Sequence, residues 1–321
     1  MKSYIHIKDI ATNIYAYKAE LMGLAIFWLM LFHSPRVGVI SVIQDFGNIG
    51  VDIFCFLSGF TCSLSYLKGA SKEGEGVLKT FYRKRIKRVL PPYFIFYLAW
   101  NAFFYIVQRY DVEGFLKNTF FYDVVVNNGT TLWYIPAITV MYLITPLYIK
   151  LCKSSKWIHC LPLLLFVIDI CRSCLGIPIF FATLWVRLPI YLVGVSLFVL
   201  KDKDIVINRY TLYGLTITTI IVICVHTYRP ELVNYKFCYV LFVPFVLTLV
   251  CLWQYKSKIW AFLGKISLEN YLLHWLTVVT IQKYLPTTPI VVNIIIAVVV
   301  ATIASYVYHV TLEKTVYRIL K

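Results

Sequence analysis

Apolar residues occur along this chain in long, nearly unbroken runs rather than in the short alternating patterns of a soluble fold. A helix needs about 20 such residues to cross the hydrocarbon core of a bilayer, because each residue advances it by about 1.5 Å. Runs near that length recur from about residue 20 to about residue 312. We predict ten spans, over residues 20–42, 46–67, 89–108, 132–150, 157–172, 180–200, 210–227, 236–254, 262–282 and 290–312.

The composition agrees with this pattern. The 321 residues are 60% hydrophobic and 14% charged, and their mean hydropathy is +0.75. A typical soluble domain is about one-quarter charged. Because helices satisfy their own backbone hydrogen bonds in lipid, the sequence predicts an all-α polytopic membrane helix bundle, a single domain over residues 1–321.

The distribution of lysine and arginine predicts the orientation of these spans. The chain has a net charge of +16, and most of its basic residues fall in alternate loops, the largest group lying between Lys68 and Arg88. Cytoplasmic loops carry such an excess, so both termini are expected in the cytoplasm. The charge is then explained by topology and by contact with anionic membrane lipids, and no nucleic-acid partner is expected. The fifth span, beginning at Trp157, has the weakest apolar run.

Ionisable side chains interrupt several of the apolar runs. Such groups are costly at membrane depth and usually face a cavity or a partner. The candidates are His33, Asp52, Arg187, Glu269, His274 and His309. Packing explains any one of them as readily as function does, whereas their combination favours a functional polar region.

His33 and Asp52 are expected near the outer side of the bundle. With a cytoplasmic N-terminus, His33 lies about thirteen residues along the first span, or about 20 Å, and Asp52 enters the second span from outside. Trp133, Tyr134 and Arg187 begin the fourth and sixth spans at that side. A neutral imidazole accepts a proton near neutral pH, and a neighbouring carboxylate orients it. This combination suits activation of a hydroxyl group.

A basic run, FYRKRIKRVLPPYF over residues 81–94, ends directly against the third span. Arg85 and Arg88 are three residues apart and would share a face of a helix. Such a pair can bind phosphate groups bidentately. On spacing alone, anchoring on lipid head groups is the favoured explanation of the same residues.

The cysteines are read as small buried apolar residues, with one exception. Cys171 and Cys174 form a C-x-x-C pair in a predicted outer loop, which is compatible with a disulfide or with two metal ligands. No further pair of metal-binding residues lies nearby in the sequence, so no metal site is expected.

Six short segments, taken in order, resemble the acyltransferase-3 family of integral membrane acyltransferases. The resemblance extends from about Lys18 to about Tyr308. The segments are MGLAIFWLMLFHS (22–34), GVDIFCFLSGF (50–60), FYRKRIKRVLPPY (81–93), LWYIPAI (132–138), WVRLPIYLVG (185–194) and SLENYLLH (267–274).

The resemblance implies a bundle of about ten helices that moves an acyl group, usually acetyl, from cytoplasmic acyl-CoA to a hydroxyl. The donor is a substrate, and no bound cofactor is implied. Acceptors in this family are mostly surface or lipid-linked carbohydrates, which places the chain in a bacterial inner membrane as a multi-pass protein. His33 matches the family's first-span catalytic histidine. Arg85 and Arg88 match basic residues that we assign to the CoA phosphates, and Ser58 and Gly59 match the family's S-G-F signature.

The sequence departs from the family at one position. Many members carry an arginine eleven residues before the histidine, and this chain has Met22 there. Lys18, one helical turn earlier, or a cation from another span would have to replace it, or the donor is held differently.

The residues lead us to expect direct transfer, with His33 as the base and Asp52 orienting it. Ser58 and Gly59 would allow close helix packing or line the donor channel. The aromatic pair Trp133 and Tyr134 would stack on the acceptor or anchor the span at the membrane interface.

Other assignments stay open. Arg187, Glu269 and His274 would line the acceptor site or a tunnel, and an acylated Ser58 or His33 would give a two-step route instead. Two further functions are compatible with the sequence: an exporter or flippase for a lipid or polysaccharide, and a non-catalytic family member acting in a complex.

Overall fold

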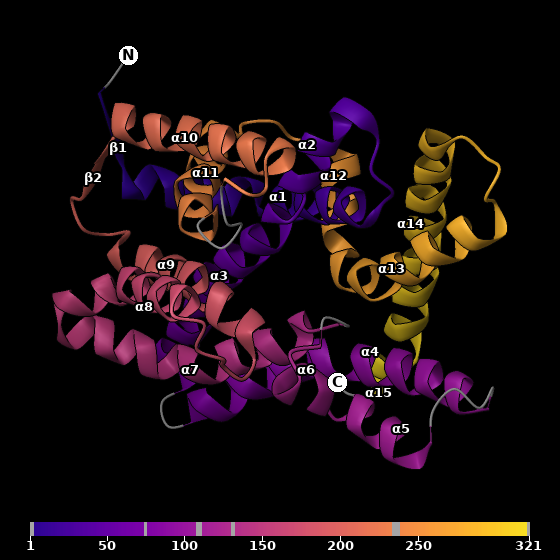
Figure 1. Cartoon of the computed structure of the whole chain (residues 1–321). Coiled ribbons are helices and arrows are strands. Elements are labelled where there is room, and N and C mark those ends of the chain that lie inside the picture. Colours follow the sequence, from indigo (N-terminus) through magenta and orange to yellow (C-terminus); the bar gives the residue numbers. More distant parts are fainter. Residues whose placement is uncertain (1–2, 74–75, 107–110, 130–131, 233–237, 320–321) are drawn as a thin grey trace. The chain divides into compact units, whose positions relative to one another are not determined.

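The computed structural model describes residues 3–73, 76–106, 111–129, 132–232 and 238–319, and these residues are almost entirely helical (Figure 1). The described part of the chain has one small sheet, in which β1 (Tyr4–His6) pairs antiparallel with β2 (Val206–Asn208). Ile5 lies opposite Ile207 in this ribbon. The all-α class predicted from the apolar runs is therefore observed, with a ribbon that the pattern did not predict.

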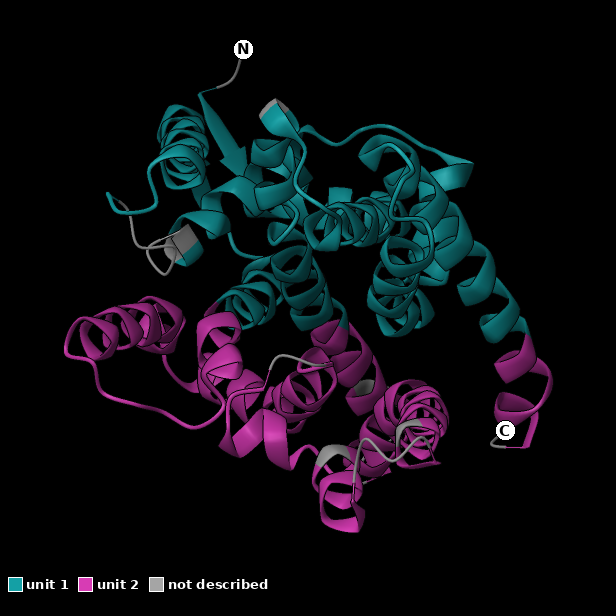
Figure 2. Ribbon diagram, turned by 45° about the vertical axis from the view of Figure 1, so that its right-hand side comes forward, with its two compact units in different colours: residues 1–61, 190–310 teal, residues 62–189, 311–321 magenta. Residues whose placement is uncertain are grey.

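The chain divides into two compact units (Figure 2). Unit 1 contains Met1–Thr61 and Ile190–Val310, and unit 2 contains Cys62–Pro189 and Thr311–Lys321. Three helices, α3, α9 and α14, each contribute residues to both units. The single domain expected over residues 1–321 stays a prediction.

Unit 1 is organised around α1 (Ile7–His33), which packs against α2, α11, α12 and α13. The other elements of unit 1 are η1 (Gly38–Ile40), α2 (Ser41–Phe46), most of α14 (Ile290–Lys314), parts of α3 (Ile49–Glu73) and α9 (Ala182–Leu200), α10 (Arg209–Tyr228), α11 (Cys238–Leu252), α12 (Lys258–Lys265) and α13 (Ser267–Tyr284).

Unit 2 is organised around α4 (Val77–Ile106), which packs against α5 and α7. The other elements of unit 2 are α5 (Val112–Thr119), α6 (Tyr122–Val126), α7 (Tyr134–Ser154), η3 (Lys156–Cys160), α8 (Leu161–Cys174), α15 (Val316–Ile319) and the remaining parts of α3, α9 and α14. Asp169, near the end of α8, is paired with Arg172 at 2.6 Å, which lowers the cost of burying its charge.

The first helix begins earlier and ends sooner than predicted. We expected a span over 20–42, but α1 starts at Ile7 because Ile7, Ile10 and Ile14 are buried at helical spacing against the rest of unit 1. It ends at His33, where Ser34 is extended before Pro35. His33 is therefore the last residue of the helix rather than a residue inside the span.

Seven helices of the described chain are long and apolar enough to cross a membrane. They are Ile7–His33, Ser41–Ala70, Tyr134–Ser154, Lys156–Cys174, Ala182–Leu200, Arg209–Tyr228 and Ile290–Ile319. The predicted third span lies in α4, and the eighth is the shorter α11. The ninth, expected as one helix over 262–282, is wrong in its boundaries, because the helix is interrupted at Ile266 to give α12 and α13.

Glycines allow two pairs of helices in unit 1 to approach each other closely. A Cβ at Gly59 of α3 would collide with the backbone carbonyl of Tyr191 in α9, and one at Gly194 would collide with that of Phe56. The helix-packing alternative proposed for Gly59 is confirmed by this contact. Gly23 of α1 and Gly264 of α12 bring those two helices together in the same way.

Candidate functional site

His33 lies at the exposed C-terminal end of α1. Its ring faces that of His274 on α13, with 5.1 Å between the ring centroids and an interplanar angle of 49°. The structure thus brings together two histidines that are 241 positions apart, and it leaves one accessible and the other buried. An accessible imidazole at a helix end can reach a substrate hydroxyl.

His274 is only 2% exposed, and helix backbone fixes its ring. Its Nδ1 lies 3.0 Å from the carbonyl oxygen of Asn270 and 2.9 Å from that of Tyr271. Carbonyl oxygens only accept hydrogen bonds, so Nδ1 must carry the proton and Nε2 must carry the lone pair of a neutral ring. This Nε2 is buried and has no hydrogen-bond partner in the part of the chain that the structure describes.

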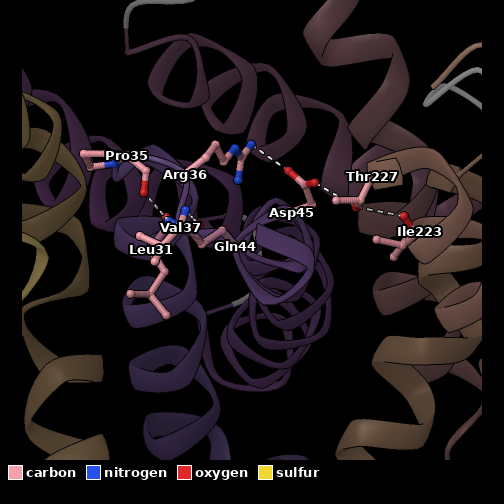
Figure 3. Close-up of polar contacts among 8 residues, drawn as sticks. All are labelled: Leu31, Pro35, Arg36, Val37, Gln44, Asp45, Ile223 and Thr227. Atoms are coloured by element: carbon pink, nitrogen blue, oxygen red, sulfur yellow. Dashed lines mark hydrogen bonds and ion pairs between the residues drawn. The ribbon is translucent and has the colours of Figure 1, made fainter. Parts of the chain in front are cut away.

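The segment after His33 is held by Gln44 of α2 (Figure 3). The Val37 N–H donates to Gln44 Oε1 at 3.0 Å, and Gln44 Nε2 donates to the carbonyls of Pro35 at 2.7 Å and Leu31 at 3.4 Å. Gln44 is 1% exposed, so its amide depends on these partners. One buried side chain therefore joins the end of α1 to the segment that follows His33.

A second polar link, next to the first, ties this region to α10 (Figure 3). Arg36 forms an ion pair with Asp45 at 2.6 Å, and Thr227 Oγ1 donates to the other oxygen of Asp45 at 2.8 Å. Arg36 also lies over the ring of Phe32 at 5.3 Å. The end of α10 thus meets the end of α1, while the beginning of each adjoins the β1–β2 ribbon, so the two helices run in the same direction.

Asp52 and Ser58 are buried in α3, within unit 1. Asp52 is in the first turn of the helix, where a carboxylate is favoured by the helix dipole. Gly47 and Gly50 bring the start of α3 against residues of the last turns of α1, and this close approach explains why both are glycine. The orienting role of Asp52 and the donor-channel role of Ser58 stay predictions.

Glu269 of α13 and His309 of α14 form a buried pair, with 2.9 Å between Glu269 Oε1 and His309 Nδ1. Both side chains are excluded from solvent. The contact provides His309, a histidine that the sequence left without a role, with a partner on the neighbouring helix. Lining of a tunnel by Glu269 stays a prediction.

The basic run is helical, as expected, but its two central arginines differ in surroundings within unit 2. Arg85 is half-buried, and its guanidinium lies 5.6 Å from the ring of Phe81 and 5.8 Å from that of Tyr142. Its Nε has no hydrogen-bond partner among the described residues. Arg88 is exposed. The two arginines are three residues apart on one continuous helix, as expected for a shared face, and Arg85 is the one with a ring of α7 beside it.

Trp133, Tyr134 and Arg187 also belong to unit 2. Trp133 precedes the first turn of α7 and Tyr134 begins it, as predicted, while Arg187 is buried in α9 with its guanidinium 6.0 Å from the Trp133 ring. Their assignment to an acceptor site, and the expected gathering of these residues around His33 and Asp52, stay predictions.

Four non-glycine residues with positive φ lie in the described segments that precede α6, α7 and α9. They are Phe121, Asn128, Leu132 and Phe181. Asn128 joins two of these segments, because its amide donates to the Ile179 carbonyl and accepts from the Ala182 N–H. Bulky residues rarely adopt this conformation and tend to do so where tertiary contacts impose it, often at functional sites.

Residues 16–20 of α1, just before Met22 in the sequence, meet a cation from another part of unit 1. Lys256, just before α12, contacts the carbonyl of Ala16, lies 4.8 Å from the Tyr17 ring and 3.7 Å from the carboxylate of buried Glu20. Lys256 is thus a candidate, beside Lys18, for the cation that the sequence led us to expect from another segment.

Cys171 and Cys174 are free and exposed at the end of α8. The disulfide alternative is therefore wrong for this structure. Among the residues that the structure describes, no group of three or more His, Cys, Asp or Glu side chains is arranged to hold a metal ion.

Sequence reasoning missed Gln44, Asp45 and Thr227. The signal in the sequence is a pair of polar residues, Gln44 and Asp45, at the predicted junction of the first two spans. Polar residues are ordinary at such a junction, so they do not indicate a site. Their partners lie on segments whose proximity no local pattern indicates.

Comparison with protein families identifies the chain. The family model described as an acyltransferase domain matches residues 21–310, nearly the whole sequence. No curated protein and no solved structure matches the chain. The matched range contains the His33–His274 pair, the basic helix and all the candidate spans except the first residues of α1 and the end of the last helix. The chain therefore belongs to the acyltransferase-3 family of integral membrane acyltransferases.

Proposed function

We propose that this membrane acyltransferase transfers an acyl group, acetyl in the first instance, from acyl-CoA to a hydroxyl of a surface or lipid-linked carbohydrate. The observation that carries the proposal is the exposed imidazole of His33, backed by the buried ring of His274. A neutral, accessible imidazole is the group that hydroxyl acylation needs as a base.

The reaction follows from this arrangement. His33 removes the proton of the acceptor hydroxyl while the hydroxyl oxygen attacks the thioester carbonyl carbon. The tetrahedral intermediate collapses with cleavage of the carbon–sulfur bond, and the departing thiolate receives a proton to give free CoA. Buried Asp52, in the α3 turn packed against α1, is the electrostatic partner that we assign to the charged imidazole.

Arg85 is the residue that we assign to the donor phosphates. Its guanidinium is held between two aromatic rings, an arrangement that fixes the plane of the fork and leaves its polar edge for an anion. Exposed Arg88, one turn later, provides a second cation for the same nucleotide. Lys256, which pairs with Glu20 of α1, is the cation that we assign to the role that arginine has in many family members.

The acceptor is proposed to bind from the side of the membrane to which α1 delivers His33. With the N-terminus in the cytoplasm, the end of α1 faces the outer side, where surface carbohydrates and their lipid-linked precursors are found. Trp133 and Tyr134 provide aromatic surfaces for a sugar, and the buried cation Arg187 supports the Trp133 ring.

The test measures acyl transfer by purified protein in nanodiscs. Labelled acetyl-CoA is supplied with a crude polysaccharide or lipid-linked sugar fraction, and both CoA release and label in the carbohydrate are recorded. His33→Ala should lower kcat by roughly 100- to 10,000-fold, as expected for loss of a general base. Arg85→Ala should raise KM for acetyl-CoA, and Arg85→Lys should restore only part of the affinity.

The matched control is His6→Ala, because His6 is an exposed histidine on β1 to which we assign no role in the reaction. It should retain wild-type turnover. If the wild type transfers label from another acyl donor but not from acetyl-CoA, the donor assignment is wrong. If carbohydrate or lipid crosses the membrane without any acyl transfer, the chain is an exporter or flippase instead.

A further inference from the structure

We propose that His274 is the positioning partner of His33: its Nε2 lone pair accepts the N–H of His33 and stabilises that ring when it takes up a proton. This inference deepens the proposed function, because it gives the base a second histidine that holds it ready. It assigns His274 to proton handling rather than to the lining of a tunnel.

The backbone of α13 determines which ring nitrogen of His274 carries the proton. Two backbone carbonyls, those of Asn270 and Tyr271, lie within 3.0 Å of Nδ1 and require a proton there. The ring is therefore neutral with its lone pair on Nε2. Because that atom is buried and has no hydrogen-bond partner in the described residues, it needs one, and burial without one is costly.

The ring of His33 lies close enough to His274 to become its hydrogen-bond partner. Its ring lies against that of His274, at 5.1 Å between centroids, and no hydrogen bond to the His33 ring occurs within the described ranges. A small rotation of the exposed ring brings one nitrogen to the His274 lone pair and leaves the other nitrogen for the acceptor hydroxyl. A base whose second nitrogen is fixed by a partner keeps one tautomer through the reaction.

The charged groups near the two histidines influence how many protons the pair holds. The charge of Arg36, in the segment after α1, interacts electrostatically with His33. The ring of Tyr271 lies 5.9 Å from that of His274. Lys265 belongs to α12, which packs on α13. Glu269, on the same helix as His274, is bonded to His309. Arg36 is itself paired with Asp45, and buried Asp52 belongs to α3, which packs on α1. Two adjacent imidazoles repel each other when both are charged, so the pair holds one proton at a time.

The experiment reads the protonation of His33 directly. Diethyl pyrocarbonate acylates unprotonated imidazole, so the rate of modification of each histidine, measured by peptide mass spectrometry against pH, gives its titration midpoint. The variants are His274→Asn, whose amide can still donate to the backbone carbonyls but lacks the outer nitrogen, and His274→Gln, whose amide oxygen reaches the position of Nε2. Thr277→Val, one turn along α13, is the matched control.

Loss of the acceptor should disfavour protonated His33 and lower its midpoint by about 1 pH unit in His274→Asn, since a hydrogen bond to a charged group is worth about 1.5 kcal/mol or more. His274→Gln should recover part of the shift, and Thr277→Val should leave the midpoint unchanged. Buried His309 should stay unreactive in the same samples as long as the variants remain folded. An unchanged His33 midpoint in folded His274→Asn overturns the proposal.

Acyl-transfer kinetics separate this proposal from the proposed function. In an active enzyme, His274→Asn should lower kcat at neutral pH, leave KM for acetyl-CoA within about twofold, and displace the acidic limb of the pH profile with the His33 midpoint. A shifted midpoint in a protein without acyl transfer supports the pair and refutes the function. Normal transfer with an unshifted midpoint does the reverse.

Discussion

Removal of the Gln44 amide should release the segment that follows His33. The perturbation is Gln44→Met, which keeps an unbranched side chain of similar length and removes every hydrogen bond. Two of the lost bonds are short, at 2.7 and 3.0 Å, and the third is long, at 3.4 Å. With about 1 kcal/mol for each good bond and an added cost for the groups left unpaired, the segment should lose about 2 to 3 kcal/mol.

That loss is measurable as hydrogen exchange at the Val37 amide, which donates to Gln44 Oε1. If exchange occurs by local opening, 2 to 3 kcal/mol corresponds to about 30- to 150-fold faster exchange. Peptide-resolved exchange of the protein in nanodiscs supplies the measurement. Acyl transfer should fall with it, because the end of α1 is no longer held in one position.

Asn293 provides a matched control for this experiment. Its buried amide donates to the carbonyls of Leu285 at 3.1 Å and Thr288 at 3.4 Å, and so holds the segment between α13 and α14 in a comparable way. Asn293→Leu should accelerate exchange around residues 285–290 and leave residues 34–46 unchanged. Wild-type protection of Val37 in Gln44→Met would refute the reasoning, because it would show that other contacts hold the segment.

Two further predictions concern packing and burial in unit 1. Gly59→Val should lower the thermal unfolding midpoint strongly, because the added methyl groups meet the backbone of α9, whereas Gly214→Ala, which enters open space on α10, should be neutral or stabilise by up to about 1 kcal/mol. Glu269→Leu should cost about 3 kcal/mol or more by leaving His309 buried without its carboxylate, and the double variant with His309→Leu should recover much of that loss in denaturant unfolding. Equal losses in the single and double variants would show that the pair is not the source.

The helical class and most of the helix positions could be predicted because they depend on local hydropathy. The predicted fourth, sixth and seventh spans agree with α7, α9 and α10 within a few residues. The start of α1 could not be predicted in this way, because Ile7, Ile10 and Ile14 form only one apolar stripe, and the surfaces that cover this stripe belong to distant segments.

The interruption at Ile266 illustrates a second limit. Lys265, Ser267 and Glu269 lie close to this residue, but apolar residues dominate residues 262–282 as a whole, so hydropathy favours one helix. The structure shows that α12 is held against α1 by the close approach of Gly264 to Ala19 and of Gly23 to Trp260. Such a contact constrains the direction of α12 separately from that of α13, and the sequence contains no local sign of it.

Some features of the candidate site could likewise be predicted from the sequence, and others required the fold. His33 and His274 could be named from the sequence because an ionisable group in an apolar run is unusual in itself. Their proximity, and the tautomer that the carbonyls of α13 impose on His274, required the fold. Gln44 could not be singled out, because an amide at the edge of a predicted span is unremarkable until its three backbone partners are known.

The β1–β2 ribbon constrains the number of membrane crossings, because two paired strands must lie on the same side of the membrane. An even number of crossings must therefore separate His6 from Val206. Five of the seven candidate helices lie between these residues, and five is odd. One more described helix in this interval, α4, is long enough to cross. If all five candidates cross, α4 must cross as well, which would give the six crossings before β2 that the hydropathy pattern predicts.

Crossing of the membrane by α4 would fix the side on which the segment after α4 lies. In a variant without native cysteines, Val112→Cys should react with a membrane-impermeant maleimide from the same side as Arg36→Cys and from the side opposite to Lys203→Cys. If α4 instead lies along the surface, Val112→Cys would react from the side of Lys203→Cys, and one of the other five helices could not be a crossing. The ribbon, three residues on each strand, thus constrains whether the segment after α4 lies on the side of Arg36 or on that of Lys203.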